Sequence, residues 1–386
     1  MPVNFSDEQL KNINSDQENK NNKQNNKQSI IKKIDAFLLT LSKVPLKERL
    51  FFVQHLGVML KAGISLSRAI NTLGKQTQNK YFQKILVDIG TKVEKGNSFA
   101  ESLMPHKKIF GELFINMIEA GELSGKLEDV LGNLFLQMKK EHALYSKVKG
   151  ALTYPVVILV AMFGIGTFMF IFIIPKITGM FDEMGAELPL PTKILIGISD
   201  ALVNNGILSG TIFIITVVSF LKIIKTKKGK YAFQSFLLKA PIISSIIKKI
   251  NIAKFSRNVS SLLKTDIMIV KTFQITANVM GNLHYREALM DMSQQIKKGG
   301  KLSEVIENYP KLFNPVVAQM VAVGEETGEL DSILEELAEF YEGEVDQIME
   351  SLPTIIEPLL ILVMGVGVGA IAVAIIMPMY SLTSAI

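Results

Sequence analysis

The chain contains no cysteine and no tryptophan, and its four histidines are His55, His106, His142 and His284. The lack of cysteine excludes a disulfide framework, a thiolate zinc site, an iron–sulfur cluster and a cysteine nucleophile. The histidines are too scattered for a paired metal-binding motif, and the sequence offers no grouped nucleophile, base and metal ligands. We therefore predict a protein that is not an enzyme and that needs no cofactor.

Charged residues are missing from three long stretches of the chain, which cover 150–175, 201–221 and 358–386. A helix needs about 20 mostly apolar residues to cross a bilayer. We therefore expect three transmembrane helices, at 151–175, 205–224 and 354–380. A buried core helix is the alternative for each stretch, and it is strongest for the second, which begins with Asn204 and Asn205.

Lysine and arginine are unevenly distributed around these stretches. They are frequent in 139–149, before the first span, and in 222–257, after the second, but few lie in 176–204. Lys and Arg are enriched in cytoplasmic segments near membrane helices. We therefore expect a cytoplasmic N-terminus, with 176–204 and 381–386 on the outside. This topology also accounts for the net charge of +6 without nucleic acid as a direct partner.

The chain matches itself without a gap when it is shifted by 203 residues. The matched glycines and prolines are Gly121, Gly125, Pro155 and Pro175 in the first copy and Gly324, Gly328, Pro358 and Pro378 in the second. The repeated unit is a polar domain followed by one span. The second span is the extra crossing that gives both copies the same orientation.

Both copies have the periodicity of helices. Apolar residues recur three and four positions apart, for example within 82–93, and Ser98 followed by Glu101 matches a capping box. Long alternation of apolar and polar residues, the pattern of strands, is missing. We therefore expect an all-α membrane protein with two tandem cytoplasmic helical bundles and three transmembrane helices.

The expected order of segments begins with a polar, disordered lead-in, in which Asn, Gln and Lys supply sixteen of the first thirty residues. The segments are the lead-in 1–45, the first bundle 46–150, the first span 151–175, an external loop 176–204, the second span 205–224, the second bundle 225–353, the third span 354–380 and an external C-terminus 381–386.

Each copy contains a glycine–glutamate motif, formed by Gly121, Glu122 and Gly125 and by Gly324, Glu325 and Gly328. The glycines predict a tight link between helices with positive φ or close packing, and direct contact with a partner is the alternative. For the glutamates we expect helix capping, with salt bridges as the alternative. The first motif does not fit a phosphate loop, because a leucine stands where Ser or Thr would bind Mg²⁺.

Residues 301–350 hold thirteen Asp and Glu against two Lys. A solvated helical face is the expected role of this acidic run. Two alternatives remain open, which are docking of a basic partner and a divalent-cation site within 325–350.

Small residues and prolines mark the spans. The small residues are Gly164 and Gly166 in the first span and Gly365, Gly367 and Gly369 in the third. They allow close helix packing, within the chain or in a homo-oligomer, and a groove for another protein's transmembrane helix is the alternative.

Four prolines, Pro155, Pro175, Pro358 and Pro378, lie near span ends, where we expect them to bend the helix without breaking its middle. Tyr154 and Glu357 precede the matched prolines at the cytoplasmic ends of the first and third spans. For Glu357 we expect a structural role, and a proton path is the alternative.

Together, the tandem repeat, the paired glycine motifs and the proline-bracketed spans resemble the type II secretion system F protein family. This family includes the PilC-type platform proteins of type IV pili, and the resemblance covers about residues 45–383. It implies a non-catalytic platform in the inner membrane. The implied partners are a hexameric assembly ATPase, pilins or pseudopilins, other inner-membrane assembly proteins, the lipid bilayer and further copies of the chain.

The sequence departs from the family pattern at three places. The Asn-, Gln- and Lys-rich N-terminus replaces a strand-like segment found in many members, which leaves the envelope type open. Asp266 stands where the first copy has Gly63, so we expect that turn to be built differently. Glu357 stands where the first copy has Tyr154.

The resulting functional prediction is a platform that couples a cytoplasmic ATPase to the insertion of pilins or pseudopilins into a filament, or to their removal. Covalent continuity from the bundles into the first and third spans would carry the motion. A transporter or channel component with duplicated halves is the alternative. Three spans are few for a transporter, and none carries a charge at its centre.

Overall fold

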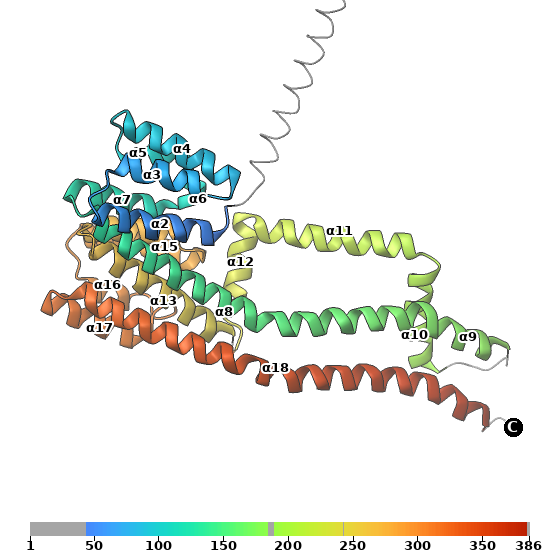
Figure 1. Ribbon diagram of the computed structural model, residues 1–386. Coiled ribbons are helices and arrows are strands. Elements are labelled where there is room, and N and C mark those ends of the chain that lie inside the picture. Colours follow the sequence, from blue (N-terminus) through green and yellow to red (C-terminus); the bar gives the residue numbers. More distant parts are fainter. Residues whose placement is uncertain (1–43, 184–188, 242, 384–386) are drawn as a thin grey trace, which may run out of the picture. The chain divides into compact units, whose positions relative to one another are not determined.

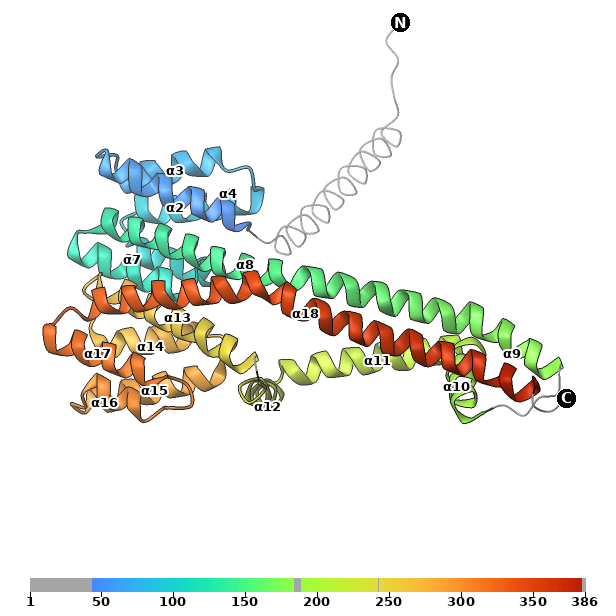
Figure 2. The same ribbon diagram turned by 90° about the horizontal axis from the view of Figure 1, so that it is seen from below.

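The computed structural model describes residues 44–183, 189–241 and 243–383 (Figures 1 and 2). Every regular element in these ranges is a helix, which confirms the predicted all-α class. The chain divides into a first unit that ends at Leu136 and a second unit that begins at Gln137. Residues 1–43 of the lead-in predicted to be disordered, and 384–386 of the predicted external C-terminus, lie outside the described residues.

The first unit is a bundle of short helices around an aromatic core. Its helices are α2 (Leu46–Lys61), α3 (Leu66–Gln76), α4 (Lys80–Glu94), α5 (Phe99–Leu103), α6 (Lys107–Phe110), α7 (Glu112–Ser124) and the start of α8 (Leu127–Phe168). Phe52, Phe82 and Phe110 meet in the core with ring centroids 5.8, 6.0 and 6.1 Å apart. The predicted N-cap is present, since Ser98 Oγ accepts from the N–H of Glu101 at 3.1 Å.

The second unit contains an equivalent bundle. Its helices are α13 (Ile243–Leu263), α14 (Ile269–Val279), α15 (Leu283–Lys297), α16 (Leu302–Glu307), α17 (Pro315–Thr327) and the start of α18 (Leu330–Thr383). Phe255, Tyr285 and Phe313 take the places of the three phenylalanines of the first unit, with Phe313 5.1 and 5.4 Å from the other two rings. The buried Tyr285 hydroxyl donates to the carbonyl of Leu312 at 2.6 Å, so its polar atom is satisfied.

The repeat extends to the boundaries of individual helices. When 203 is added to their residue numbers, α3, α4 and α7 coincide end for end with α14, α15 and α17. The long helices α8 and α18 begin at the matched positions Leu127 and Leu330. The structure therefore confirms that one helical unit is used twice.

The turn after the first long helix of each bundle is the same in both units, so the expectation of a differently built turn at Asp266 is wrong. Gly63 has φ +80° and Asp266 has φ +58°. In both turns, successive N–H groups donate to carbonyls three and five residues earlier, as in a Schellman helix end. Aspartate enters the left-handed region more readily than most residues, so the backbone turn survives the loss of glycine.

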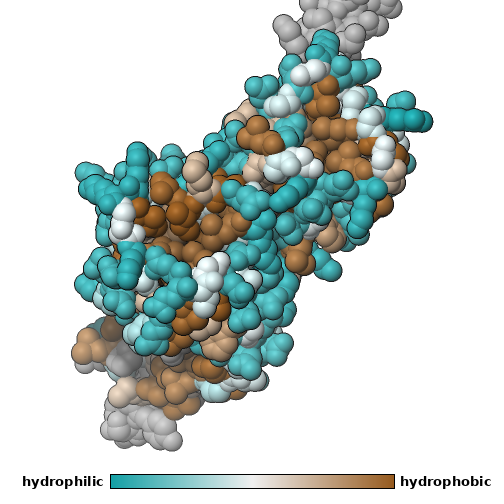
Figure 3. All heavy atoms as spheres, turned by 90° about the vertical axis from the view of Figure 1, so that its left-hand side faces the viewer, coloured by the Kyte–Doolittle hydropathy of each residue, from teal (hydrophilic) through white to brown (hydrophobic). Residues whose placement is uncertain are grey.

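Among the described residues, three helices are long and apolar enough to cross a membrane, which agrees with the three predicted spans. They lie within Leu127–Gly179, Leu208–Lys225 and Leu330–Ala374. In the most apolar 18-residue stretch of each, only 6%, 0% and 6% is buried by protein. Such continuous apolar exposure suits lipid contact. The face seen in Figure 3 differs, because hydrophilic side chains predominate there and apolar residues form patches between them.

The far end of the first span is interrupted. After α8, a π-helical turn η2 (Met169–Ile173) leads into α9 (Ile174–Glu183), which contains Pro175. The chain continues through α10 (Leu190–Val203), α11 (Gly206–Lys225) and α12 (Lys227–Leu237). The external loop predicted for 176–204 is therefore largely helical. Its helix α10 packs against η2, α9, α11 and α18. Pro155 and Pro358 end neither α8 nor α18.

Substitution of Gly63 tests the shared turn. Gly63→Ala should destabilise the first unit by about 1–2 kcal/mol, because alanine is strained at positive φ. Gly63→Asn should cost less, because Asn tolerates this region as Asp266 does. Hydrogen-exchange protection of α2 and α3 in the solubilised full chain measures both effects.

The matched control for this test is Gly132→Ala. Gly132 is a helical residue whose added Cβ would meet open space, and alanine there should stabilise the helix by up to about 1 kcal/mol. Equal protection in the Ala and Asn variants of Gly63 would contradict the left-handed turn.

Candidate functional site: two glycine–glutamate corners and the charged half of α18

In each unit the glycine–glutamate motif forms the corner between the last two helices. A Cβ on Gly121 would lie 2.9 Å from a methyl group of Val130, and a Cβ on Gly324 would lie 3.0 Å from the Cα of Leu330. Real Cβ atoms do not approach this closely in a packed interior. The first glycine of each motif therefore lets α7 or α17 pass directly against the long helix that follows.

The second glycine of each motif has a left-handed backbone. Gly125 has φ +70° and Gly328 has φ +76°, a region that costs other residues about 1–2 kcal/mol. At the first corner, the N–H of Gly125 donates to Glu122 O at 3.3 Å and that of Lys126 to Gly121 O at 3.0 Å. Backbone requirements thus account for both glycine pairs.

The glutamate of each motif holds the start of a short helix. Glu122 accepts from the N–H groups of Phe99 and Ala100 at 2.5 and 2.8 Å. Glu325 accepts in the same way from Leu302 and Ser303 at 2.8 and 3.2 Å. Each carboxylate therefore satisfies helix-start donors that would otherwise lack a partner, as expected for a capping role.

The hydrogen bonds at the second corner also set the ionisation of its carboxyl. Burial pushes the pKa of Glu325 upward, but the backbone N–H groups of Leu302 and Ser303, the Ser303 hydroxyl and the charge of Lys301 lower it below the ordinary 4.5. Because folding lowers this pKa, the stabilisation by the carboxylate is complete at pH values above the ordinary pKa of 4.5. It is lost as the pH falls through the lowered pKa.

A cavity of about 400 Å³ opens beside the second corner. Its walls include Glu325 and the apolar side chains of Leu263, Ile269, Ile296, Leu302 and Leu330. The second motif thus borders a surface depression with two carboxylates, Glu325 and Asp331, on an otherwise mostly apolar wall.

The acidic first half of α18 is only in part the solvated face that its sequence indicates, because Glu336, Glu339 and Glu350 are exposed. Five of its carboxylates are paired with basic residues of α8, of α13 and of the position directly after α13, all in the same unit. The acidic partners are Glu335, Glu339, Glu342, Glu344 and Asp346, and the basic partners are Lys140, Lys147, Lys249, Arg257 and Lys264. These basic residues are far away in sequence, so the local charge run could not reveal the pairing. Among the described residues, no group of three or more acidic or histidine side chains could hold a metal ion.

Arg257 is the centre of this ion-pair array. Its side chain is 7% exposed and forms a bidentate pair with Glu342, with Nε 2.9 Å and Nη2 2.8 Å from the two carboxylate oxygens. Glu335 and Glu339 lie 3.5 and 3.7 Å from the guanidinium. Burial lowers the pKa of Arg257, but the three carboxylates outweigh it and raise the pKa above its usual range. A planar guanidinium suits such a multiple contact better than an ammonium group does.

The middle of α8 belongs to this array, although the sequence assigns 137–150 to the first bundle. Gln137 is buried, donates to Asn258 at 2.6 Å and accepts from the hydroxyl of Ser261 at 3.0 Å. Two helical turns after Gln137, Leu144 packs against Val345 and Met349 of α18. Three helices, α8, α13 and α18, therefore meet just before two of them become membrane spans.

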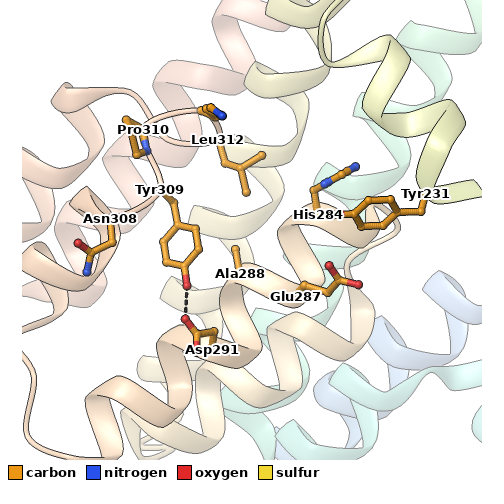
Figure 4. Close-up of a pocket in the computed structure, with 10 residues that line it drawn as sticks. Tyr231, His284, Glu287, Ala288, Asp291, Asn308, Tyr309, Pro310 and Leu312 are labelled. Carbon is orange, nitrogen blue, oxygen red and sulfur yellow. Dashed lines mark hydrogen bonds between the residues drawn. The ribbon is translucent and has the colours of Figure 1, made fainter. Parts of the chain in front are cut away.

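A second, larger cavity of about 620 Å³ lies on the second bundle, between α12, α15 and the connection after α16 (Figure 4). Tyr309 donates to Asp291, and burial together with this carboxylate raises the pKa of Tyr309 to about 12. The ring of His284 contacts that of Tyr231 with centroids 4.1 Å apart and the planes tilted by 41°, and His284 is hydrogen-bonded to Ser235 at 2.9 Å. These polar side chains are satisfied within the chain, and no motif in the sequence singled them out.

The small residues of the spans do not pack against another part of the described chain. A Cβ added at any of them would meet no atom within 4 Å; the glycines are Gly164, Gly166, Gly365, Gly367 and Gly369. Of the two expected forms of close packing, the described residues therefore supply no partner within the chain, and packing in a homo-oligomer stays a prediction. Tyr154 and Glu357 are also exposed on their helices.

Comparison with known proteins gives a consistent result. The chain matches the family model "Type II secretion system (T2SS), protein F" twice, over residues 52–175 and 255–378. The two matches are separated by the 203-residue repeat, and each ends at the proline near the far end of a span.

Individual relatives cover most of the chain. It is 35% identical to the type IV pilus assembly protein PilC of Thermus thermophilus, over 87% of this chain and 83% of that protein. It is 31% identical to the PilC protein of Myxococcus xanthus, over 88% and 81%. It is 26% identical to the type II secretion system protein F of Aeromonas hydrophila, over 91% and 90%. These names refer to assembly and secretion, not to a catalysed reaction.

The corner geometry predicts a clear order of effects for three glycine substitutions in the second unit. Gly328→Ala should cost about 1–2 kcal/mol through its positive φ, and Gly324→Ala about 1–3 kcal/mol through overpacking against Leu330. Gly343→Ala is the matched control in α18, because its Cβ would meet open space; it should be neutral or stabilising. Thermal midpoints of the solubilised chain report all three, and a loss at Gly343 equal to that at Gly324 would refute close approach.

The ion-pair array makes a second prediction. Arg257→Gln should lower stability by about 2–3 kcal/mol, less than the ~3–5 kcal/mol of a fully buried pair, because Glu335 and Glu339 remain 32% and 58% exposed. Lys147→Gln, which removes a more exposed pair with Asp346, should cost less than about 1 kcal/mol. Denaturant midpoints measure the difference. Similar losses for the two variants would show that Arg257 is not central.

Proposed function

The chain belongs to the type II secretion system protein F family, and from this premise we propose that it is a non-enzymatic inner-membrane platform of a type IV pilus or type II secretion machine. The observation that carries the proposal is the double family match, in which each copy joins a helical bundle to a membrane span. In this role the chain couples a cytoplasmic hexameric ATPase to the insertion of pilins or pseudopilins into a filament, or to their removal.

The proposed orientation has both bundles in the cytoplasm. It is supported by the excess of Lys and Arg in 139–149 and 222–257, compared with 176–204. The N-terminus is then cytoplasmic, and the connection between the first two spans and the C-terminus are external. Only this orientation gives a cytoplasmic ATPase access to the two corners.

The proposed coupling path follows the two long helices. α18 is one helix from Leu330 to Thr383, so the corner, the ion-pair array and the third span are parts of a single element. α8 likewise extends from Leu127 to Phe168. A helix with unbroken hydrogen bonds transmits a displacement along its axis better than a flexible linker does. The side-chain contacts among α8, α13 and α18 support transmission as one body.

The proposed partners follow from the same arrangement. The ATPase contacts the bundles, and pilins or pseudopilins contact the spans with other inner-membrane assembly proteins. The uncovered glycine faces, Gly164 with Gly166 and Gly365 to Gly369, are suited to close contact with a helix from another molecule. That molecule is a second copy in a homo-oligomer or a filament subunit in the membrane.

An insertion experiment tests the coupling. A flexible Gly-Ser insertion within 350–354 should leave the protein in the membrane and able to co-purify with a hexameric secretion ATPase, but filament assembly or secretion should be lost. The physical reason is that the insertion breaks the helix between the ion-pair array and the third span. The same insertion within 1–40 is the control and should retain assembly.

Two results would contradict the proposal. Normal assembly with the insertion within 350–354 would exclude rigid transmission through α18. Failure of the unmodified chain to recover any assembly ATPase or pilin from solubilised membranes would contradict the platform role itself.

A further inference from the structure

Pro175 leaves a backbone carbonyl in the first span without its helical donor. In the π-helical turn η2, the N–H of Ile174 donates to the carbonyl of Met169, five residues earlier. The next pair in this register is Pro175 with Phe170, and proline has no N–H to donate. The hydroxyl of Ser199 takes that place and donates to Phe170 O at 2.6 Å.

The third span has the same defect at the matched position. Pro378 lies in the α-helical register of α18, where its missing N–H would have bonded the carbonyl of Ala374. A threonine hydroxyl fills this position too, since Thr192 Oγ1 donates to Ala374 O at 2.6 Å. Two prolines that are 203 residues apart are thus each compensated by a hydroxyl from outside their own helix.

Both hydroxyls come from one face of α10. Thr192 and Ser199 are seven residues apart, which places them two helical turns apart on the same side. They are 6% and 1% exposed, although the spans around them are almost wholly uncovered by protein. In both views α10 lies at the ends of α8 and α18 that are remote from the second bundle (Figures 1 and 2).

The bonds are strongly favoured in this environment. A carbonyl that loses its helical donor within or next to lipid has no water to replace it, so an external hydroxyl is the available partner. Both acceptors are carbonyls of the two duplicated spans, the first and the third, and both donors are side chains of α10. α10 is therefore bonded at once to the first and the third span.

We propose that α10 is a clamp that joins the far ends of the first and third spans through Ser199 and Thr192, with Pro175 and Pro378 creating the acceptors. The two spans that carry the bundles then move as one body at their far ends. The clamp does not depend on the proposed function; only the use of its motion in filament assembly rests on that function.

A double-mutant design tests the clamp on the purified full chain in lipid nanodiscs, without ATPase or pilin. Ser199→Ala and Thr192→Val should each speed hydrogen exchange of the α10 backbone by roughly three- to thirtyfold, the range that corresponds to ~0.6–2 kcal/mol for a hydrogen bond between membrane helices. Thr192→Ser keeps the donor and should exchange like the unmodified chain.

The proline variants separate the clamp from a general packing effect. With Pro175→Ala the carbonyl of Phe170 regains a backbone donor, so Ser199→Ala should no longer speed exchange; Pro378→Ala should likewise silence Thr192→Val. Thr178→Val is the matched control, because Thr178 bonds Ile174 O in its own helix. It should leave α10 unchanged.

The proposal is overturned if either hydroxyl variant exchanges like the unmodified chain, or if its effect persists in full after the matching proline is replaced. These results are independent of the platform role, which fails separately if no assembly ATPase or pilin is recovered. If the exchange results are as expected but no assembly ATPase or pilin is recovered, the clamp is supported and the proposed function is contradicted.

Discussion

The close approach of two helices at Gly121 and at Gly324 is the constraint on which the rest of the fold depends. Each long helix begins at this contact, and the left-handed glycine that follows ends the preceding helix only a few residues before it. A side chain at either position would push the two helices apart and turn the long helix away from its course. The glutamate between the glycines then ties a short helix to the same corner.

The charged half of α18 shows how one helix serves two environments. In its first part, water and basic partners surround the carboxylates, whereas no residue after Glu357 is charged. Arg257 reduces the repulsion among three glutamates that would otherwise lie close together on one helix face. The helix can therefore remain continuous up to the point where lipid replaces the protein and the water.

The far side of the membrane region is governed by a different requirement, which is that every backbone carbonyl needs a donor. Proline removes such donors in both repeats, and hydroxyl groups from α10, a helix outside the repeat, donate to the freed carbonyls instead. The duplicated parts of the chain thus depend on an element that was not duplicated. This element, α10, lies in the connection between the first and the second span.

The sequence alone was sufficient for the helical class, the three spans, the 203-residue repeat and the family resemblance. Each of these rests on local composition or on a match between linear patterns, which survive without knowledge of the fold. Local capping at Ser98 was also readable, because donor and acceptor are three residues apart. The turn at Asp266 was misjudged, since the residue type alone does not show that the backbone retains a positive φ.

Only the tertiary structure decided which charges face one another and which carbonyls receive a hydroxyl. The acidic run of α18 meets basic side chains from helices far away in sequence, and Thr192 reaches a carbonyl of Ala374 across a helix interface. The packing of distant elements determines these partners, and no periodicity in the sequence predicts which residues will meet. What the sequence by itself determined was therefore the set of helices and their duplication, whereas contacts between helices decided how their charges and backbone groups are satisfied.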